Sequence, residues 1–386
     1  MARCNFCKTD SPLISKELGA FLPCIRENPR KALAVAKKAH IKSRIAFGLP
    51  EKPPGDPQQG IRCNLCVNEC RIPSNSVGYC GVRKNEQGKI TGVSSERGKA
   101  SWYHDPLPTN CLADWVCPGG IGAGYPRFAH CEGPEEGYEN LAVFFHACSF
   151  NCLYCQNWRF KEETFKPHTV SVHDLVADLD EKTSCICFFG GDPTPQIPFS
   201  LKAARLCLKK KKERILRTCW KTNGSMHPKL LDEMIGIALN SGGCIKFDLK
   251  AWNENLHIAL TGITNKKTLE NFSRAGEKIS RRPIPPLLIA STLLVPGYKE
   301  RERKCSILSG FLQIKFYLQD IAVAHGLNLK SKFFRKIKHA CIITQNLTHQ
   351  FSGTLTSAIA DQLLHQNFPQ PAAFHIRTND YGEFAS

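Results

Sequence analysis

The sequence lacks the features that would place it in a membrane or direct it out of the cell. Its longest apolar run near a predicted strand, LLIASTLLV at 287–295, is far shorter than the roughly 20 residues that cross a bilayer. The N-terminal residues MARCNFCKTD contain neither the apolar segment nor the small-residue cleavage site of a secretory signal. We therefore expect a globular cytoplasmic protein with no membrane association.

Acidic residues are scarce: the chain has 34 of them against 52 lysines and arginines, which gives a net charge of +18. A basic surface raises nucleic acid as a partner, because binding releases counterions. The excess is nevertheless spread along the chain, and its densest run, Lys209 to Lys212, follows the helix-like segment PFSLKAARLCL. Such a run is typical of the exposed end of a surface helix, and no aromatic residues are interleaved with it. We expect no nucleic-acid partner.

Cysteine, by contrast, is abundant, with twenty residues. In a chain without an export signal, a reducing compartment keeps thiols free, so that clustered thiols indicate metal binding rather than disulfides. Composition divides the chain into four expected regions: an N-terminal segment with a cysteine pair and a Pro/Gly linker (1–60), a cysteine-rich module (61–140), a core (141–298) and a C-terminal segment (299–386).

Short apolar runs alternate with helix-compatible sequence throughout the core. Continuous apolar runs of this length are typical of parallel strands that are buried on both faces. We expect an α/β fold with a barrel-like parallel sheet. The predicted strands are NLAVFF (140–145), CICFF (185–189), RILRTCW (214–220), CIKFDL (244–249) and LLIASTLLV (287–295).

Polar residues and cysteines follow the first four runs directly, where a parallel α/β fold places its functional site. The first run leads into the C-x3-C-x2-C array of HACSFNCLYC, and the second leads into GGDPTPQ, whose glycines permit close backbone approach to a ligand. The third run ends in KTNG, and the fourth in Asp248 and Lys250. These four strand ends predict one site at a common mouth.

Three cysteines in one short loop suit a [4Fe-4S] cluster, since thiolates are its usual ligands and one iron stays open for a small chelating molecule. The alternative is a zinc site that His146 or another cysteine completes, because structural zinc ordinarily takes four protein ligands. The preceding strand and the GGDPT loop favour the cluster.

These residues resemble the radical S-adenosylmethionine superfamily. The resemblance rests on HACSFNCLYC after a first strand, with Tyr154 just before the last cysteine, and on the GGDP loop after the second. It is strongest to the pyruvate formate-lyase activating enzyme-like branch, and there to a prokaryotic set in which a cysteine-rich module precedes the core. The matching blocks include CNLCVNECRI, GYCGVR, HDPLPTNCLADWVCPGG, TNGSM, KFDLKAW, TGITNKKTLENF and STLLVPGY, so the similarity spans roughly residues 1–298.

The resemblance implies a partial (β/α)6 TIM-like barrel that binds a [4Fe-4S] cluster and S-adenosylmethionine. Reductive cleavage of S-adenosylmethionine would release a 5'-deoxyadenosyl radical, which abstracts hydrogen from a substrate. A partner of the activating-enzyme type would be a glycyl-radical protein, and the electron donor would be a ferredoxin or flavodoxin. Matched by motif, the cluster ligands are Cys148, Cys152 and Cys155, and the candidate cofactor contacts are Tyr154, Gly190, Gly191, Asp192, Asn223 and Asp248.

One residue departs from the family pattern beside this expected pocket. Lys221, in CWKTNG, stands where relatives usually carry an acid, so the charge there is reversed. No catalytic residue is assigned beyond the cluster ligands.

A second group, Cys63, Cys66, Cys70 and Cys80, has the spacing C-x2-C-x3-C-x9-C. Four thiols within 18 residues can close a metal site that holds together a module with little apolar sequence. Zinc and an auxiliary iron-sulfur cluster both suit this spacing, with a slight preference for zinc or a purely structural role, and unliganded buried thiols are the alternative.

Two further cysteine groups are more ambiguous. Cys111 and Cys117 are as readily interpreted as ordinary buried thiols as they are as part of a functional site. The following GGIGAG (119–124) is interpreted as a flexible loop that covers the active site. Cys4, Cys7 and Cys24 resemble a zinc ribbon with one ligand missing, because Phe21 occupies the position of the third cysteine. Either His40 or water replaces the missing ligand of this site, or the site no longer binds a metal.

After Tyr298 the resemblance stops, and residues 300–386 do not show a coherent sixth strand. The segment is interpreted either as a divergent cap or as the product of a shifted reading frame, which would leave the sheet edge unprotected. The alternative to a radical enzyme is a cysteine-rich, metal-stabilised binding or electron-transfer protein without chemistry on S-adenosylmethionine.

Overall fold

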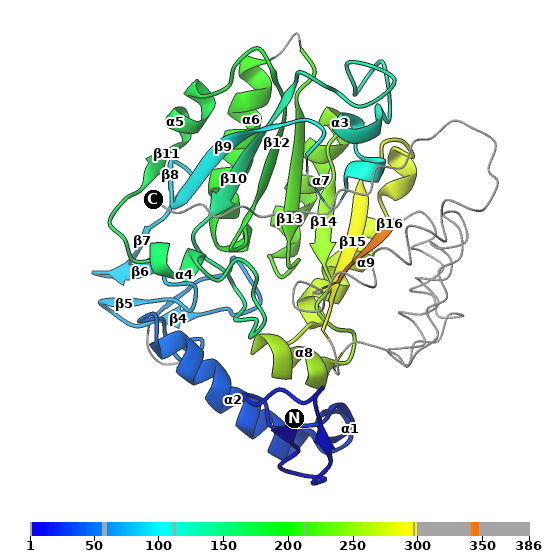
Figure 1. Ribbon diagram of the computed structural model, residues 1–386. Helices are drawn as coiled ribbons and strands as arrows, with labels where there is room; N and C mark the ends of the chain where they lie inside the picture. Colours follow the sequence, from blue (N-terminus) through cyan, green and yellow to red (C-terminus); the bar gives the residue numbers. More distant parts are fainter. Residues whose placement is uncertain are drawn as a thin grey trace, which may run out of the picture. The chain divides into compact units, whose positions relative to one another are not determined.

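A seven-stranded sheet lies at the centre of this computed structural model, which describes residues 2–55, 60–109, 111, 113–211, 214–295, 298 and 341–346 (Figure 1). The strand order is β16-β15-β14-β13-β12-β10-β9. Neighbours from β10 to β16 are parallel, and β9 pairs antiparallel with β10. The predicted α/β fold with a central parallel sheet is confirmed. The strands are β9 (Ala100–Pro106), β10 (Glu139–Phe145), β12 (Thr183–Gly190), β13 (Arg217–Thr222), β14 (Ile245–Asp248), β15 (Leu288–Leu294) and β16 (Cys341–Asn346).

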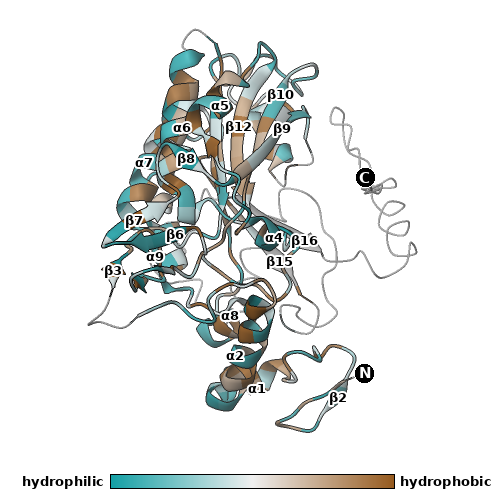
Figure 2. Ribbon diagram, turned by 90° about the vertical axis from the view of Figure 1, so that its left-hand side faces the viewer, coloured by the Kyte–Doolittle hydropathy of each residue, from teal (hydrophilic) through white to brown (hydrophobic). Residues whose placement is uncertain are grey.

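Alternation along the strands gives the sheet two different faces. One face, here called the helix face, carries large apolar side chains that are buried beneath the helices, such as Val143, Phe188, Trp220 and Phe247. Figure 2 shows the hydrophobic colour on these central strands. The opposite face, here called the cavity face, carries cysteines and lysines at the intervening positions. All five apolar runs predicted as strands form strands, because each can bury its helix-face side chains.

Four helices cover the helix face, and their ends carry recognisable sequence signals. Ser171 and Asp174 form a capping box at the start of α5, and Gly242, at φ +80°, ends α7. Lys209 and Lys210 are exposed at the end of α6, as predicted, whereas Lys211 is buried and donates to the carbonyl of Asp180. These helices are α5 (Val172–Ala177), α6 (Ile197–Lys210), α7 (Pro228–Ser241) and α9 (Lys266–Gly276).

The N-terminal segment packs against α8 (Glu254–Thr261), at the lower end of the molecule in Figure 1. It contains the short strands β1 (Ala2–Arg3) and β2 (Asp10–Ser11) and the helices α1 (Leu22–Glu27) and α2 (Pro29–Ile45). Helix α2 has the sequence PRKALAVAKKAHIKSRI. Ala32 and Ala36 of α2 share an apolar cluster with Leu256 and Leu260 of α8, which fixes the segment to the rest of the protein. Among the described residues, no helix is long and apolar enough to cross a bilayer.

The cysteine-rich module is built from short, polar strands that appear hydrophilic in Figure 2. Its small core of Cys70, Ile72 and Tyr79 includes Phe150 and Ile263 from outside the module, so it does not bury apolar surface alone. Its strands are β3 (Ile61–Arg62), β4 (Arg71–Ile72), β5 (Ser76–Val77), β6 (Arg83–Glu86), β7 (Lys89–Gly92) and β8 (Arg97–Gly98), which pairs with β11 (Val170–Ser171). The remaining short helices are η1 (Asp114–Val116), α3 (Pro118–Ile121), α4 (Phe160–Glu163), η2 (Thr194–Gln196) and η3 (Ile279–Arg281).

Three expectations about the chain's organisation are corrected. The segment 100–106, expected within the module, is strand β9 of the main sheet. A sixth parallel strand, β16, follows β15 and lies inside the C-terminal segment where none was expected; its CIIT sequence is β-branched enough for a strand but too short to stand out. GGIGAG is not a loop over the site, because α3 lies beside Arg217 at the opposite end of β13. The interpretation of the C-terminal segment as a divergent cap or as the product of a shifted reading frame concerns residues that lie, apart from β16, outside the described ones.

Candidate active site

An open cavity lies at the carboxyl ends of the parallel strands β10 and β12–β15. Parallel α/β folds place ligands at this end of the sheet, because the loops that leave the strands converge there. The cavity lining includes every residue that the motif match predicted for the cluster and its cofactor. These are Cys148, Cys152, Tyr154, Cys155, Gly190, Gly191, Asp192, Asn223 and Asp248.

The cysteine loop that follows β10 is held by backbone hydrogen bonds to the end of α8. Asn151 N donates to Thr261 O at 2.9 Å, and Leu153 N donates to Leu260 O at 3.0 Å. The amide of Asn68, in the cysteine-rich module, donates to Ser149 O at 2.8 Å. The loop is therefore clamped from two sides before any ligand binds.

Asn151 connects this loop to the N-terminal helix α2. Its amide nitrogen donates to His40 Nδ1 at 3.1 Å and to Ser43 Oγ at 2.7 Å, and its oxygen accepts from Lys161 Nζ at 2.8 Å. Sequence reasoning did not find this network, because His40 lies more than a hundred positions away in the chain and carries no motif. No local signal in the sequence could have revealed it.

The three cysteines are half-buried, and the loss of water around the thiols raises the pKa of Cys148 and of Cys155, because a thiolate is costly away from water. Two lysines, Lys161 and Lys250, line the same cavity and would compensate thiolate charge. Among the described residues, the sulfur atoms of Cys148, Cys152 and Cys155 do not all lie within 4.8 Å of one another. A single zinc ion holds sulfur atoms about 3.8 Å apart, from its Zn–S distance of about 2.3 Å, whereas a cubic cluster holds its thiolates farther apart. This donor set fits the cluster better than one ion.

His146 does not complete a metal site here. Its Nε2 lies 3.0 Å from Ser101 Oγ on β9, and it is not part of the cavity wall. The zinc alternative of the sequence analysis therefore has no fourth ligand from this histidine.

Gly190 and Gly191 bring the loop after β12 against the cysteine loop. A Cβ atom on Gly191 would lie 2.4 Å from Ala147 O, and Gly190 has φ +101°, in the region that favours glycine. Gly191 N donates to Phe145 O, and Asp192 N donates to Ala147 O, both at 2.8 Å. The glycines are needed for this contact between loops.

Asp192 joins the second and third strand ends. Its carboxylate accepts from Thr194 N at 2.7 Å and from Asn223 N at 2.6 Å. Burial raises the pKa of Asp192 to about 6, although these hydrogen bonds oppose the shift. Asn223 in turn donates to Ser149 Oγ at 2.8 Å, so one chain of contacts links three loops.

A half-buried ion pair occupies the fourth strand end. Lys250 pairs with Asp248 and lies 5.9 Å from the ring centre of Tyr154. Burial opposes the charge of Lys250, but Asp248 and the Cys152 thiol hold its pKa well above the ordinary value. Burial raises the pKa of Tyr154, which stays a neutral phenol.

Two further residues complete the wall. Lys221, identified in the sequence by its reversed charge, lines the cavity, and burial lowers its pKa in spite of nearby Asp248. Ser291 of β15 also lines it, and sequence reasoning missed this residue because a serine within an apolar strand carries no distinguishing pattern.

The four cysteines of the module, Cys63, Cys66, Cys70 and Cys80, line a second, smaller cavity. Cys63 N donates to Cys70 O across the β3–β4 hairpin, and Tyr79 N contacts Cys70 Sγ at 3.4 Å. Burial raises the pKa of Cys70 to about 12 and also raises that of Cys66 and Cys80. No three of these thiols fall within single-ion distance of one another in the part of the chain that the structure describes.

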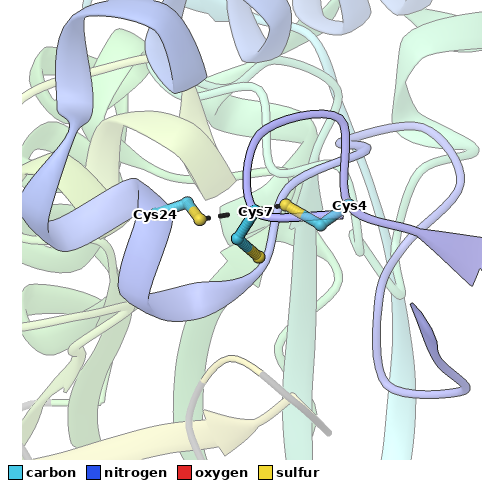
Figure 3. Close-up of side chains that lie close together, drawn as sticks. All are labelled: Cys4, Cys7 and Cys24. Carbon is cyan, nitrogen blue, oxygen red and sulfur yellow. Dashed lines mark hydrogen bonds between the residues drawn. The ribbon is translucent and has the colours of Figure 1, made fainter. Parts of the chain in front are cut away.

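The N-terminal cysteines do meet. Figure 3 shows Cys4 and Cys7, from the loop after β1, facing Cys24 of α1, and their sulfur atoms all lie within 4.8 Å. His40 does not join them: its Nε2 contacts Ala259 O at 3.1 Å and its Nδ1 contacts Asn151. Because both ring nitrogens are used elsewhere, the expectation that His40 could replace the missing ligand is wrong.

Comparisons with known proteins identify the core of the chain. The family model of the Radical SAM superfamily matches residues 142–305. Pyruvate formate-lyase 1-activating enzyme of Escherichia coli is 31% identical over 137 residues, 33% of this chain and 52% of that protein. A putative glycyl-radical enzyme activating enzyme of Methanocaldococcus jannaschii is 30% identical over 142 residues, 36% of this chain and 50% of that protein. Isethionate sulfite-lyase activating enzyme of Desulfovibrio desulfuricans is 27% identical over 124 residues, 32% of this chain and 36% of that protein.

The chain thus spans about half the length, or less, of the relatives it matches. The matched region contains the cysteine loop and all the other residues that line the cavity. A [4Fe-4S] cluster and S-adenosylmethionine are the cofactors that such a domain implies, and the donor set described above fits them. Residues 142–305 thus match the Radical SAM superfamily, and in this region the chain is similar to the activating enzymes of the pyruvate formate-lyase type.

Proposed function

We propose that this protein is a radical enzyme that cleaves S-adenosylmethionine reductively at a [4Fe-4S] cluster and uses the product to abstract hydrogen from a partner protein. The observation that carries the proposal is the position of three thiols from one loop on the wall of a cavity that the other strand ends enclose. The sheet is then a partial (β/α)6 barrel, and its six parallel strands, in chain order from β10 to β16, support this.

The residues of the cavity divide the work of binding. Cys148, Cys152 and Cys155 would hold the cluster, and Gly190 and Gly191 would let the methionine amino group approach the backbone. Asn223 and Asp248 would contact the ribose or carboxylate, and Tyr154 lines the same cavity. Asp192 keeps the loops in register through its bonds to Thr194 N and Asn223 N.

When bound, the reduced cluster and S-adenosylmethionine supply a 5'-deoxyadenosyl radical. The protein's own task is to orient the reacting groups and to exclude water from them. Phe150, Phe160 and Phe189 line the cavity and reduce its access to solvent. Lys161 and Lys250 offset the negative charge of the thiolates, which burial would otherwise disfavour.

The substrate that we propose is the glycine-bearing loop of a glycyl-radical protein. Three relatives are named as activating enzymes, of pyruvate formate-lyase, of a glycyl-radical enzyme and of isethionate sulfite-lyase. The electron donor would be a ferredoxin or flavodoxin. A reducing cytoplasm would suit this chemistry, and the free thiols of the described cysteines support that location.

The second cavity is proposed to hold a structural metal centre at Cys63, Cys66, Cys70 and Cys80. Zinc or an auxiliary iron-sulfur cluster would close it, and the wide separation of the thiols favours the cluster. The centre would stabilise a module whose apolar core is small.

The decisive test is anaerobic reconstitution with iron and sulfide, followed by incubation with S-adenosylmethionine and a strong reductant. We expect formation of 5'-deoxyadenosine and a change in the electron paramagnetic resonance spectrum on addition of S-adenosylmethionine. The variant C148A/C152A/C155A should lose both signals, whereas C207A, which removes a lone buried thiol of α6, should keep both.

Replacement of Cys63 and Cys66 by alanine separates the two sites. It should lower the melting temperature and leave 5'-deoxyadenosine formation per folded molecule unchanged. Normal cluster content in the unaltered protein without cleavage would instead favour the alternative, an electron-transfer or binding protein.

A further inference from the structure

Three cysteines of the N-terminal segment bring their sulfur atoms together, and we call this group the N-terminal thiol site. Cys4 and Cys7 come from the loop after β1, and Cys24 comes from the first turn of α1 (Figure 3). The three sulfur atoms all lie within 4.8 Å of one another, and Cys4 Sγ is 3.8 Å from Cys24 Sγ. Among the described residues, no other three cysteines lie this close together.

This separation suits one tetrahedral zinc ion. A Zn–S distance of about 2.3 Å at the tetrahedral angle places the ligand sulfur atoms about 3.8 Å apart. Sulfur atoms in van der Waals contact are therefore at the right spacing, because the ion lies in the hollow between them and needs no separate cavity. The N-terminal thiol site thus has the dimensions of a single-ion site, without room for inorganic sulfide.

The backbone around Cys4 is arranged to stabilise a negatively charged sulfur. Phe6 N donates to Cys4 Sγ at 3.4 Å, and Phe21 N donates to the same sulfur at 3.3 Å. Hydrogen bonds from amide groups favour the charged form of an acceptor. Lys8, at φ +61°, turns the chain back, and its N–H donates to Cys4 O at 3.1 Å. The C-x2-C loop is therefore closed around its first sulfur, as a metal-binding loop requires.

Two cations lie on the same loop. Arg3 Nε donates to Lys8 O at 3.2 Å, and Lys8 Nζ donates to Asn5 O at 2.9 Å. Three thiolates carry one more charge than a divalent ion neutralises, and nearby cations reduce the cost of that excess. The charge of the loop is consistent with a three-thiolate zinc site.

Ordinary packing accounts for only two of the three thiols. Cys4 and Cys24 are 0% and 8% exposed and form a small buried cluster with Ile14, where cysteine is a good core residue. Cys7 is exposed, so its position beside these two sulfur atoms is not a consequence of burial. A bound metal would explain the position of Cys7, and it would stabilise a segment whose own apolar cluster is small.

The fourth coordination position is open to water. Phe21 lies three residues before Cys24, the interval of a C-x2-C pair, and its side chain packs against the cysteine cluster. A phenyl ring supplies no ligand atom, and both ring nitrogens of His40 are used elsewhere. Because Cys7 is exposed, solvent reaches the site beside it.

We propose that Cys4, Cys7 and Cys24 bind one zinc ion through three thiolates, with a water molecule as the fourth ligand. The ion joins the loop after β1 to helix α1. Ile25 of α1 packs in one cluster with Leu256 of α8, the helix whose end holds the loop of the candidate active site. The N-terminal thiol site therefore secures the segment that covers α8, and the inference does not depend on the proposed activity.

The first test is the zinc content of the full chain, purified anaerobically and separated from loosely bound metal by gel filtration. The variant C7A should contain about one zinc ion fewer per chain than the unaltered protein. This variant removes an exposed thiol, so the loss cannot come from a defect in the core. The matched control is C131A, which removes a partly exposed thiol outside the cysteine groups described above and should keep the full zinc content.

The second test fills the open position. In F21C a fourth thiolate would replace water, and we expect zinc to pass to a chromophoric chelator at least about tenfold more slowly than from the unaltered protein, since even residues behind the ligands change metal affinity about 10–100-fold. The control F21A removes the same ring without supplying a ligand and should not slow the release.

Circular dichroism verifies that each variant is folded. Should C7A fail to fold, the comparison of F21C with F21A decides, because both variants keep all three thiols. Equal zinc contents of folded C7A and C131A would overturn the proposal, as would zinc release from F21C that is no slower than from F21A. A disulfide between Cys4 and Cys24 in the anaerobic protein, in place of zinc, would also overturn it.

Discussion

At Gly191 a single added methyl group would lie 2.4 Å from Ala147 O, in the stretch of backbone that leads to the cluster cysteines. This position shows how closely two loops approach at the site. The neighbouring Gly190 accepts a hydrogen bond from Asn157 through its carbonyl at 3.3 Å, so both glycines contribute backbone rather than side chain. Their role is geometric, and it can be tested residue by residue.

We expect Gly191→Ala to lower the free energy of unfolding by about 1–3 kcal/mol, because the loops must move apart to accept the Cβ atom. Iron content and 5'-deoxyadenosine formation should fall with it. The matched control is Gly236→Ala in α7, where a Cβ would have no neighbour within 4 Å; it should be neutral or stabilising by up to about 1 kcal/mol. Denaturant unfolding measures both, and equal stabilities of the two variants would contradict the packing argument.

The reversed charge at Lys221 is also a feature of a single residue. Lys221 faces a cavity that already contains Lys161 and Lys250, and Asp192 and Asp248 are the acidic groups among its lining residues. Sequence reasoning identified the residue but could not assign it a contact. Its position beside Asp248 follows from the pairing of β13 with β14.

At the scale of elements, the loop between β9 and β10 is fixed to the start of β13 by a buried ion pair. Arg217 donates to Glu135 through both terminal nitrogens, at 2.7 and 2.5 Å, and to Ser184 Oγ at 2.8 Å. Burial disfavours the charge of Glu135, but Arg217 outweighs it and holds the pKa of this carboxyl below its ordinary value. The pair positions the loop that carries Cys111 and Cys117.

We expect Glu135→Gln to cost about 3–5 kcal/mol of unfolding free energy, since it leaves the Arg217 charge buried without a counter-charge. The control is Asp232→Asn, which breaks the exposed pair between Arg274 of α9 and Asp232 of α7 and should cost no more than about 1 kcal/mol. Urea unfolding followed by circular dichroism measures the difference. A cost for Glu135→Gln no larger than that of the surface variant would refute this account.

At the scale of the whole molecule, His40 ties the N-terminal helix α2 to both α8 and the cysteine loop. Since Nε2 must donate to Ala259 O, Nδ1 accepts from Asn151, and the ring is neutral. Burial lowers the pKa of His40 to about 4. A folded-state pKa below the unfolded value means that the unfolded chain binds the proton first as the pH falls.

We therefore expect the stability contributed by His40 to be present above about pH 6.5 and to be lost as the pH falls towards 4. The loss is on the order of 3 kcal/mol in unfolding free energy, relative to the variant His40→Gln, which does not titrate. Denaturant unfolding of both proteins at several pH values measures it. If the two curves run parallel between pH 7 and pH 4, the histidine is not buried as a neutral ring.

Much of this architecture could be predicted locally. The five apolar runs became strands because each is apolar enough to be buried on the helix face, and the C-x3-C-x2-C and GGD patterns lie within single loops. The strand β16 was missed because its six residues carry little signal without the pairing to β15. The segment 100–106 was misplaced because an antiparallel edge strand resembles its polar surroundings in composition.

The sequence by itself determined which loops carry the chemistry, since the spacing of Cys148, Cys152 and Cys155 and the position of the glycines are properties of contiguous residues. Only the tertiary structure decided what those loops touch: His40 holds Asn151, Lys221 faces the cavity, and Cys111 meets Cys187, Cys219 and Cys244. The reason is physical, because strand register and side-chain alternation bring together residues that are far apart in the chain, and no short stretch of sequence encodes those distances.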